Sequence, residues 1–142
     1  MNTNKFLIGG IIGGIAFFLL GWLVWGMLLM NFMKDNSGTA SGVMKEQADM
    51  VWWALIVGNI FSGLALSYVL SKAGTASAGA GAGVGAVFGL LVAASFDFTM
   101  LGVSNINTLK GSLVDIAANI VVTAIVGAIV GAYMGMGKKA AA

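Results

Sequence analysis

The chain has 142 residues, of which 59% are hydrophobic and 8% are charged, and its formal net charge is +2. Soluble domains carry roughly 25% charged residues, so this chain cannot cover a water-facing surface and its solvent must be lipid. The seven basic residues are lysines spread along the chain. No basic patch forms, so nucleic acid is not an expected partner.

Cysteine and histidine are both absent. Disulfides, thiol nucleophiles, and haem or zinc sites built on these two residues are therefore excluded. The sequence also offers no nucleophile beside a base. We therefore expect a protein that is not an enzyme and that needs no cofactor and no metal.

Four apolar runs are long enough to span a membrane, which takes about 20 residues of helix. They cover about residues 6–33, 50–71, 79–101 and 111–136. The first run is longer than a signal-peptide core of about 7–15 residues, so we expect it to be retained as a span. Short connections make neighbouring helices antiparallel. The sequence predicts an all-α membrane protein, with a single membrane domain over residues 1–142 that is an antiparallel four-transmembrane-helix bundle.

Tryptophans gather toward one end of the first two runs, and they are Trp22, Trp25, Trp52 and Trp53. Tryptophan is enriched where a helix leaves the hydrocarbon and enters the headgroup region. These side chains are therefore predicted to anchor the helices at the membrane interface. An aromatic ligand-binding box is the alternative, and nothing else in the sequence selects it.

Small residues recur at a spacing of four in three of the predicted helices. They are Gly9 and Gly13, then Gly81, Gly85 and Gly89, then Gly127, Gly131 and Gly135. Such a Gly-x-x-x-Gly or glycine-zipper ridge lets two helix backbones approach closely in lipid. The pattern predicts tight packing, either within one chain or between chains. Our first functional hypothesis is therefore a non-enzymatic packing protein in lipid, a homo-oligomer or an accessory subunit beside other membrane subunits.

Asp97 and Asp115 are the acidic residues inside the long apolar runs. Asp97 lies about one turn before the end of the third helix and Asp115 about one turn after the start of the fourth, so antiparallel helices put them at similar depth. Asp115, Asn119 and Thr123 recur at spacing four and share one helix face. Two carboxylates close together in a low dielectric do not both ionise easily and could share a proton. The alternative function is a small transporter or an ion- or proton-coupled protein.

A structural interpretation of the polar residues also stays open. Ser112-Leu-Val-Asp115 fits a capping box, which puts Asp115 at a positive helix end. Asp97 could reach the headgroups or pair with Lys110. Asn59, a further candidate for the polar site, could equally serve as a hydrogen-bonding residue between helices.

The lysines of the connections favour one orientation. Four lie on the side of the termini and three on the other side: Lys5, Lys72, Lys138 and Lys139 against Lys34, Lys45 and Lys110. Cytoplasmic loops carry the excess of positive charge. We therefore expect both termini in the cytoplasm, with the chain in the bacterial inner membrane.

The segment Gly21-Trp22-Leu-Val-Trp25, followed by a polar loop, resembles an uncharacterised bacterial family of small four-helix membrane proteins that carries Gly-x-x-Trp-Tyr there. The stretch 119–133, which contains Gly-x-x-x-Gly, is similar to the closing stretch of that family. This chain has Gly26 where the family has Tyr, and it lacks a Trp in the segment 30–33. The resemblance implies a four-helix membrane fold and carries no activity or site residue.

Overall fold

The computed structural model describes residues 2–136. Its elements, in chain order, are α1 (Thr3–Leu23), a π-helical turn (Val24–Leu28), α2 (Met30–Asp35), a 3-10 turn (Gln47–Asp49), α3 (Trp52–Lys72), α4 (Ala78–Val103) and α5 (Leu109–Gly135). Within residues 2–136, four helices are long and apolar enough to cross a membrane. The predicted all-α membrane fold is confirmed. One boundary differs, because the first run does not continue as a single helix to residue 33: its spanning part ends at Leu28.

Local sequence signals explain where three of the helices begin. Asn2, Ser77 and Thr108 are the N-caps of α1, α4 and α5, and each side chain accepts a hydrogen bond from a backbone N–H three residues on. Capping satisfies one of the backbone donors that a helix start leaves free. The end of α3 is also explained by a local sequence signal. Gly74 follows it with φ +68°, a conformation that favours glycine, and Thr75 N–H donates to Leu70 at 3.0 Å.

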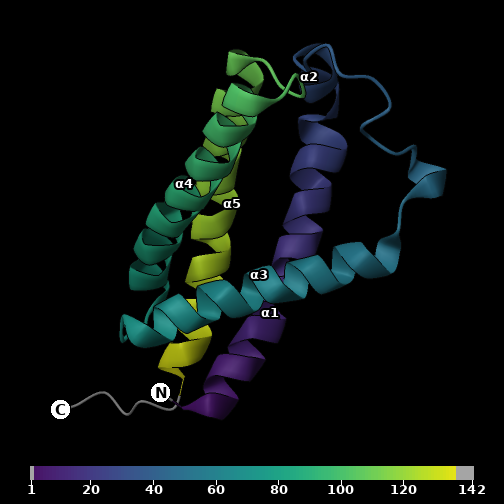
Figure 1. Cartoon of the computed structure of the whole chain (residues 1–142). Coiled ribbons are helices and arrows are strands. Elements are labelled where there is room, and N and C mark those ends of the chain that lie inside the picture. The colour runs from purple at the N-terminus through teal and green to yellow at the C-terminus, as the bar shows by residue number, and fades with distance from the viewer. Residues whose placement is uncertain (1, 137–142) are drawn as a thin grey trace.

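Helices α4 and α5 form a tightly packed antiparallel pair (Figure 1). A side-chain carbon added at Gly81 would meet the backbone of Gly127, and one added at Gly85 would meet the backbone of Thr123. A third contact joins Gly131 to Ser77. The absence of side chains on this ridge therefore brings the two backbones into direct contact, which is how small residues hold helices together in lipid.

Helix α3 runs across α1 instead of beside it (Figure 1). The two backbones touch where Gly63 lies against Gly10, Gly13 and Gly14. Ser67 Oγ also donates to the Phe6 carbonyl at 2.8 Å, which adds a hydrogen bond between the helices. Glycine on both sides permits close approach at one point, and the long connection after α2 does not force the two helices into alignment.

All eight glycines that the sequence analysis assigned to helix packing lie against another segment of the same chain. The buried apolar core forms where α1, α3 and α5 meet, and it comprises Leu66, Leu70, Val122, Val126, Val130 and Met134. Large apolar side chains such as Leu19, Ile56 and Leu91 are exposed on the outside. This distribution suits a protein whose solvent is lipid.

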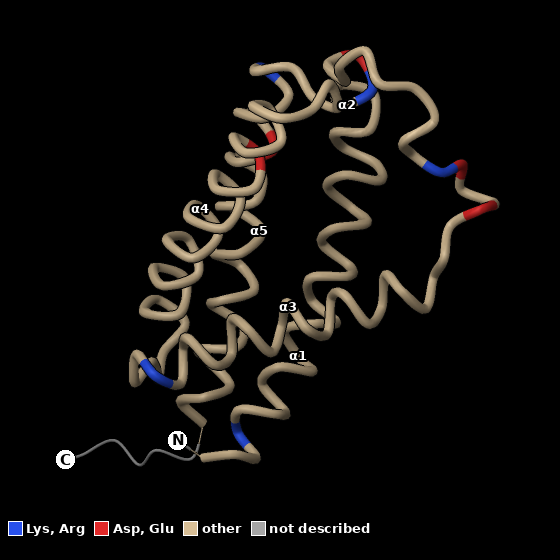
Figure 2. Tube along the Cα trace, viewed as in Figure 1, with Lys and Arg blue, Asp and Glu red and all other residues tan. Residues whose placement is uncertain are grey.

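The two described ends of the chain lie at the same end of the molecule. Lys5 Nζ donates to the carbonyl groups of Met134 at 3.1 Å and Met136 at 2.6 Å, at the C-terminal end of α5. Figure 2 shows the charged residues at the two ends of the molecule and in the long loop, apart from acidic residues within the α4/α5 pair. Lys138 and Lys139 are two of the lysines on which the predicted orientation depends, and they lie outside the described residues.

The opposite end is closed by a contact between two connections. Gly38 N–H donates to the Ile106 carbonyl at 2.7 Å, and Thr108 N–H donates to the Asn36 carbonyl at 3.1 Å. A side chain on Gly38 would meet the backbone of Asn105. This contact ties the segment after α2 to the turn between α4 and α5, and it fixes α1 beside the two helices that carry the acidic residues.

Candidate intramembrane carboxyl site

Asp97 continues the packed face of α4. The buried residues of this helix are Gly81, Gly85, Gly89, Ala93 and Asp97, at a constant spacing of four. Because residues four apart lie above one another on a helix, the ridge that packs against α5 carries the carboxyl group into the interior. The Asp97 side chain is only 2% exposed.

The Asp97 carboxyl group is buried without a full set of partners. Its Oδ2 atom has no hydrogen-bond partner among the described residues. Neither structural alternative raised from the sequence holds for it. The side chain does not reach the surface, and the Lys110 ammonium lies over the ring of Phe32, 5.3 Å from its centroid. An unpartnered buried oxygen costs free energy, so it needs an explanation.

Asp115, by contrast, is held by two donors. Trp25 Nε1 donates to Oδ1 at 2.6 Å, and Asn119 Nδ2 donates to Oδ2 at 2.8 Å. Asn119 Nδ2 also donates to the Asp115 backbone carbonyl at 3.0 Å. These two donors hold the Asp115 carboxyl group in one orientation.

Trp25 lies in the π-helical turn of the first span, and its side chain meets Asp115 of α5. Leu29 N–H donates to the Val24 carbonyl at 2.7 Å, five residues back instead of four. The extra residue in the turn rotates the following side chains relative to a regular helix. Such π turns are rare, and they occur frequently at functional sites.

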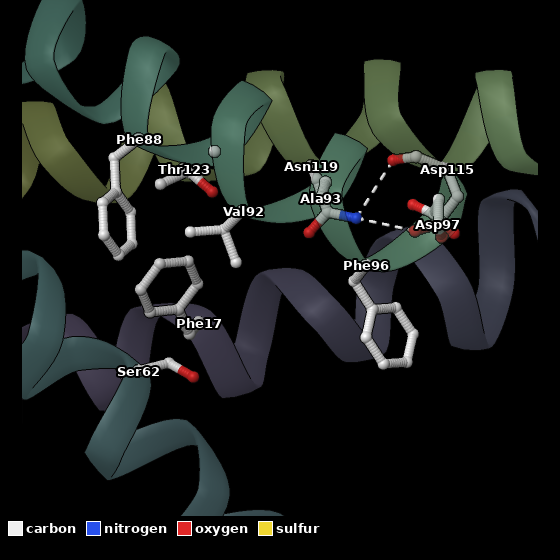
Figure 3. A pocket seen from close by; sticks show the side chains of 11 residues that line it. Phe17, Ser62, Phe88, Val92, Ala93, Phe96, Asp97, Asp115, Asn119 and Thr123 are labelled. Carbon is white, nitrogen blue, oxygen red and sulfur yellow. Dashed lines mark hydrogen bonds between the residues drawn. The ribbon is translucent and has the colours of Figure 1, made fainter. Parts of the chain in front are cut away.

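The two acidic side chains open into one pocket, called here the carboxyl pocket, with a volume of about 210 Å³. All four long helices line it: Phe17 comes from α1, Ser62 from α3, Phe88 and Asp97 from α4, and Asp115 from α5. Figure 3 shows Asp97, Asp115 and Asn119 at one end and Phe17 and Phe88 at the other. The pocket is large enough to hold several water molecules.

The capping box predicted at Ser112 is wrong. Thr108 is the N-cap of α5 and its side chain accepts from Gly111 N–H at 3.1 Å. Ser112 therefore lies inside the helix, fully buried, and its Oγ has no partner among the described residues. Asp115 is nearly two turns into α5, too far from the helix start to act as a capping group.

The structure brings together three of the four residues predicted for the polar site. Asp97, Asp115 and Asn119 line the carboxyl pocket, whereas Asn59 does not. Asn59 Nδ2 instead donates to the Leu55 carbonyl of its own helix at 2.8 Å, so Asn59 has no part in this site.

Trp25 differs from the other three predicted interface anchors. Trp22, Trp52 and Trp53 are exposed by 55%, 44% and 70%, which suits the headgroup region. Trp25 is half-buried and binds Asp115. Sequence reasoning missed this contact, and it missed Phe17 and Ser62 in the pocket wall, because nothing in a local pattern signals a π turn or the way two helices cross.

Comparison of the chain with protein-family models, with curated proteins and with solved structures finds no match. The resemblance of the segment 21–25 to a bacterial family therefore stays a prediction. Over residues 2–136, no group of three or more acidic side chains is placed to hold a metal ion. What the site offers chemically is one well-bonded carboxyl group, one under-bonded carboxyl group and a small cavity between them and an aromatic wall.

Proposed function

We propose that this chain is a small ion-coupled membrane protein in which Asp97 and Asp115 together bind a proton or a monovalent cation. The observation that carries the proposal is the buried Asp97 Oδ2 atom, which has no hydrogen-bond partner among residues 2–136, in a side chain that lines a pocket. An ionisable residue inside a membrane segment is costly and marks ion or proton sites. A carboxyl group with a vacant acceptor, beside a cavity, suits that role.

The two carboxyl groups have different surroundings and so take different roles. Donors from Trp25 and Asn119 stabilise a negative charge on Asp115. A second negative charge beside it in low dielectric is unfavourable, so Asp97 holds the exchangeable proton. Arrival of a cation compensates the second charge and releases that proton. Exchange of this kind is the elementary step of an ion-coupled protein.

Infrared titration of the purified protein tests this proposal. We expect a protonated-carboxyl band at about pH 5, above the ordinary aspartate value of about 4, that disappears in Asp97→Asn. Asp35→Asn, which removes an exposed carboxylate of α2, should leave the band unchanged. Asparagine imitates a protonated aspartate in shape, so Asp97→Asn should still fold. In proteoliposomes, Asp97→Asn and Asp115→Asn should abolish ion or proton flux.

Two results would contradict the proposal. One is that both carboxyl groups ionise together near the ordinary value of about 4 for an aspartate. The other is that both variants lose stability and yet keep every measurable activity, which would make the carboxyl groups structural.

We further propose that the site lies in the outer half of the bacterial inner membrane, with both chain ends in the cytoplasm. The support is the lysine distribution together with the position of Asp97 and Asp115 away from the end where Lys5 binds α5. In this orientation the carboxyl pocket lies nearer to the outer face of the membrane than to the cytoplasmic face.

A second candidate function is association with another copy or with other membrane subunits. One observation favours it: Gly83 on α4 has open space above its Cα and contributes to an apolar groove with Val69, Val84 and Val87 between α3 and α4. An incoming helix could pack closely there. Gly127 and Gly131 are less suitable for this purpose, since both lie against Gly81 inside the chain.

Light scattering after gel filtration in mild detergent tests the association. If the groove is used, Gly83→Leu should shift the protein to a smaller species. Gly79→Leu is the matched control, because Gly79 lies one turn away, also has open space, and does not line the groove. A wild-type chain that is already a monomer and co-purifies with nothing would rule out this candidate.

A further inference from the structure

We infer, building on the proposed ion site, that the carboxyl pocket binds an organic ammonium ion, with its positive head at Asp97 and its apolar part between Phe17 and Phe88. The inference names the class of cation that the proposed function leaves open. It rests on the composition of the pocket wall, on the position of its opening and on its size.

The wall of the pocket is divided by chemistry. Asp97, Asp115 and Asn119 supply oxygen atoms at one end, and Phe17 and Phe88 supply rings at the other (Figure 3). A bare inorganic ion would use only the first end. A cation attached to an apolar group matches both ends, because its charge meets a carboxylate and its hydrocarbon meets aromatic rings.

The pocket opens toward lipid. Its lining includes Phe96 and Val92, whose side chains are 63% and 53% exposed on the outer surface of α4. Hydrated inorganic ions do not enter from hydrocarbon, since removing their water is costly. An amphipathic ammonium ion partitions into the membrane with its charge near the headgroups, and it can reach such an opening sideways.

The volume limits the ligand to a small molecule. About 210 Å³ is below the roughly 300–1,000 Å³ of pockets that hold drug-sized ligands. One ring or a short alkyl chain with an ammonium group is the appropriate size. The probe of choice is therefore phenethylammonium, and 2-phenylethanol is its neutral partner with a hydroxyl in place of the ammonium.

Isothermal titration calorimetry of the full chain in detergent tests the inference, with proton release followed in buffers of different ionisation enthalpy. Phenethylammonium should bind and release about one proton per molecule, and 2-phenylethanol should bind at least tenfold more weakly. Asp97→Asn should abolish the saturable binding, which also separates it from partition into micelles, and Asp35→Asn should not.

The aromatic end has its own variants. Phe17→Leu and Phe88→Leu keep an apolar side chain and remove the ring that packs against the phenyl group of the ligand, and each should weaken phenethylammonium binding by roughly threefold to tenfold. Phe61→Leu is the matched control, because Phe61 is 68% exposed on α3 and lies outside the pocket. Circular dichroism checks that each variant keeps its helices, so a loss of binding reports the pocket and not unfolding.

Each outcome decides something. If Na⁺ or K⁺ releases the proton and phenethylammonium does not bind, the organic-cation inference fails while the proposed ion site stands. Equal binding of 2-phenylethanol, or equal effects of Phe17→Leu and Phe61→Leu, also overturns it. If no cation releases a proton and infrared titration finds both carboxyl groups ionised, the inference and the proposed function fail together.

Discussion

Trp25 and Asp115 are 90 residues apart in the chain and make the hydrogen bond that ties the first span to α5 at the site. The indole carries the only N–H of the tryptophan side chain, and it points at a carboxylate oxygen 2.6 Å away. Because Asp115 is fixed by this donor and by Asn119, its carboxyl group stays in one place beside Asp97. Trp25 is therefore a positioning residue for the site.

Replacing Trp25 with phenylalanine removes the donor and keeps an aromatic ring. Hydrogen bonds to charged groups contribute about 1.5–3 kcal/mol in water-soluble proteins, and side-chain hydrogen bonds within membranes average about 0.6 kcal/mol. We expect Trp25→Phe to lower the free energy of unfolding by about 1 kcal/mol, measured by reversible denaturation in mixed micelles.

Trp53→Phe is the control for this measurement, since Trp53 is 70% exposed and does not line the carboxyl pocket. It should change stability by less than about 0.5 kcal/mol. Equal effects of the two substitutions would mean that the Trp25–Asp115 hydrogen bond contributes nothing to the fold.

At the scale of the element, α4 carries glycine on two of its faces, and only one of these faces packs against α5. Gly81, Gly85 and Gly89 face α5 and are buried, whereas Gly79 and Gly83 have open space beyond their Cα atoms. The same residue type therefore has two different consequences on one helix. On the inner face glycine permits backbone contact with α5, whereas on the outer face it touches no other part of the described chain and lowers helix propensity.

A pair of alanine substitutions separates these two effects. In Gly85→Ala the new methyl group meets the backbone of Thr123, so the helices must move apart, and we expect a loss of about 1–3 kcal/mol of stability. Gly83→Ala meets nothing within 4 Å and should raise stability by up to about 1 kcal/mol, because alanine favours helix.

Thermal unfolding of both variants in the same detergent checks this prediction. The two substitutions are chemically identical and lie two residues apart, so detergent and expression effects cancel. A Gly85→Ala protein as stable as Gly83→Ala would show that α4 and α5 do not pack through this ridge.

At the scale of the whole molecule, the contact of Lys5 with the end of α5 and the contact of Gly38 with Ile106 lie at opposite ends. The first holds the two described chain ends together, and the second holds the loops of the other end together. Between them lie four apolar helices. In Figure 1, α1, α4 and α5 run between these two ends, and α3 crosses α1.

Labelling of single cysteines tests this topology, and the natural absence of cysteine makes every introduced thiol unique. We expect Ala40→Cys to react with an impermeant maleimide added outside intact cells, and Asn4→Cys to react only after the membrane is opened. Both positions are exposed. Equal labelling of the two from one side would overturn the four-span topology, and reversed labelling would overturn the cytoplasmic placement of the ends.

Much of this architecture could be predicted from sequence because its signals are local. The lengths of the apolar runs predicted four spans. The second run ends near Gly74, which follows the last residues of α3. The spacing of four from Gly81 to Asp97 can be read in the sequence, and the structure shows all of these residues on the packed face of α4. A capping signal is also local, yet Ser112 was the wrong choice, because Thr108 stands one turn earlier and caps the helix first.

The rest depended on how the helices rotate and cross. The hydrogen bond from Trp25 to Asp115 joins residues far apart in the chain, and so does the crossing that brings Phe17 and Ser62 to the carboxyl pocket. Asn59 stays outside that pocket and bonds to its own helix. Hydropathy, small-residue spacing and caps are properties of one segment at a time. The sequence by itself therefore determined that the chain is built of apolar helices suited to a membrane, where these helices lie, and which acidic residues fall within them. Only the tertiary structure decided which side chains share a pocket, because that follows from contacts between segments.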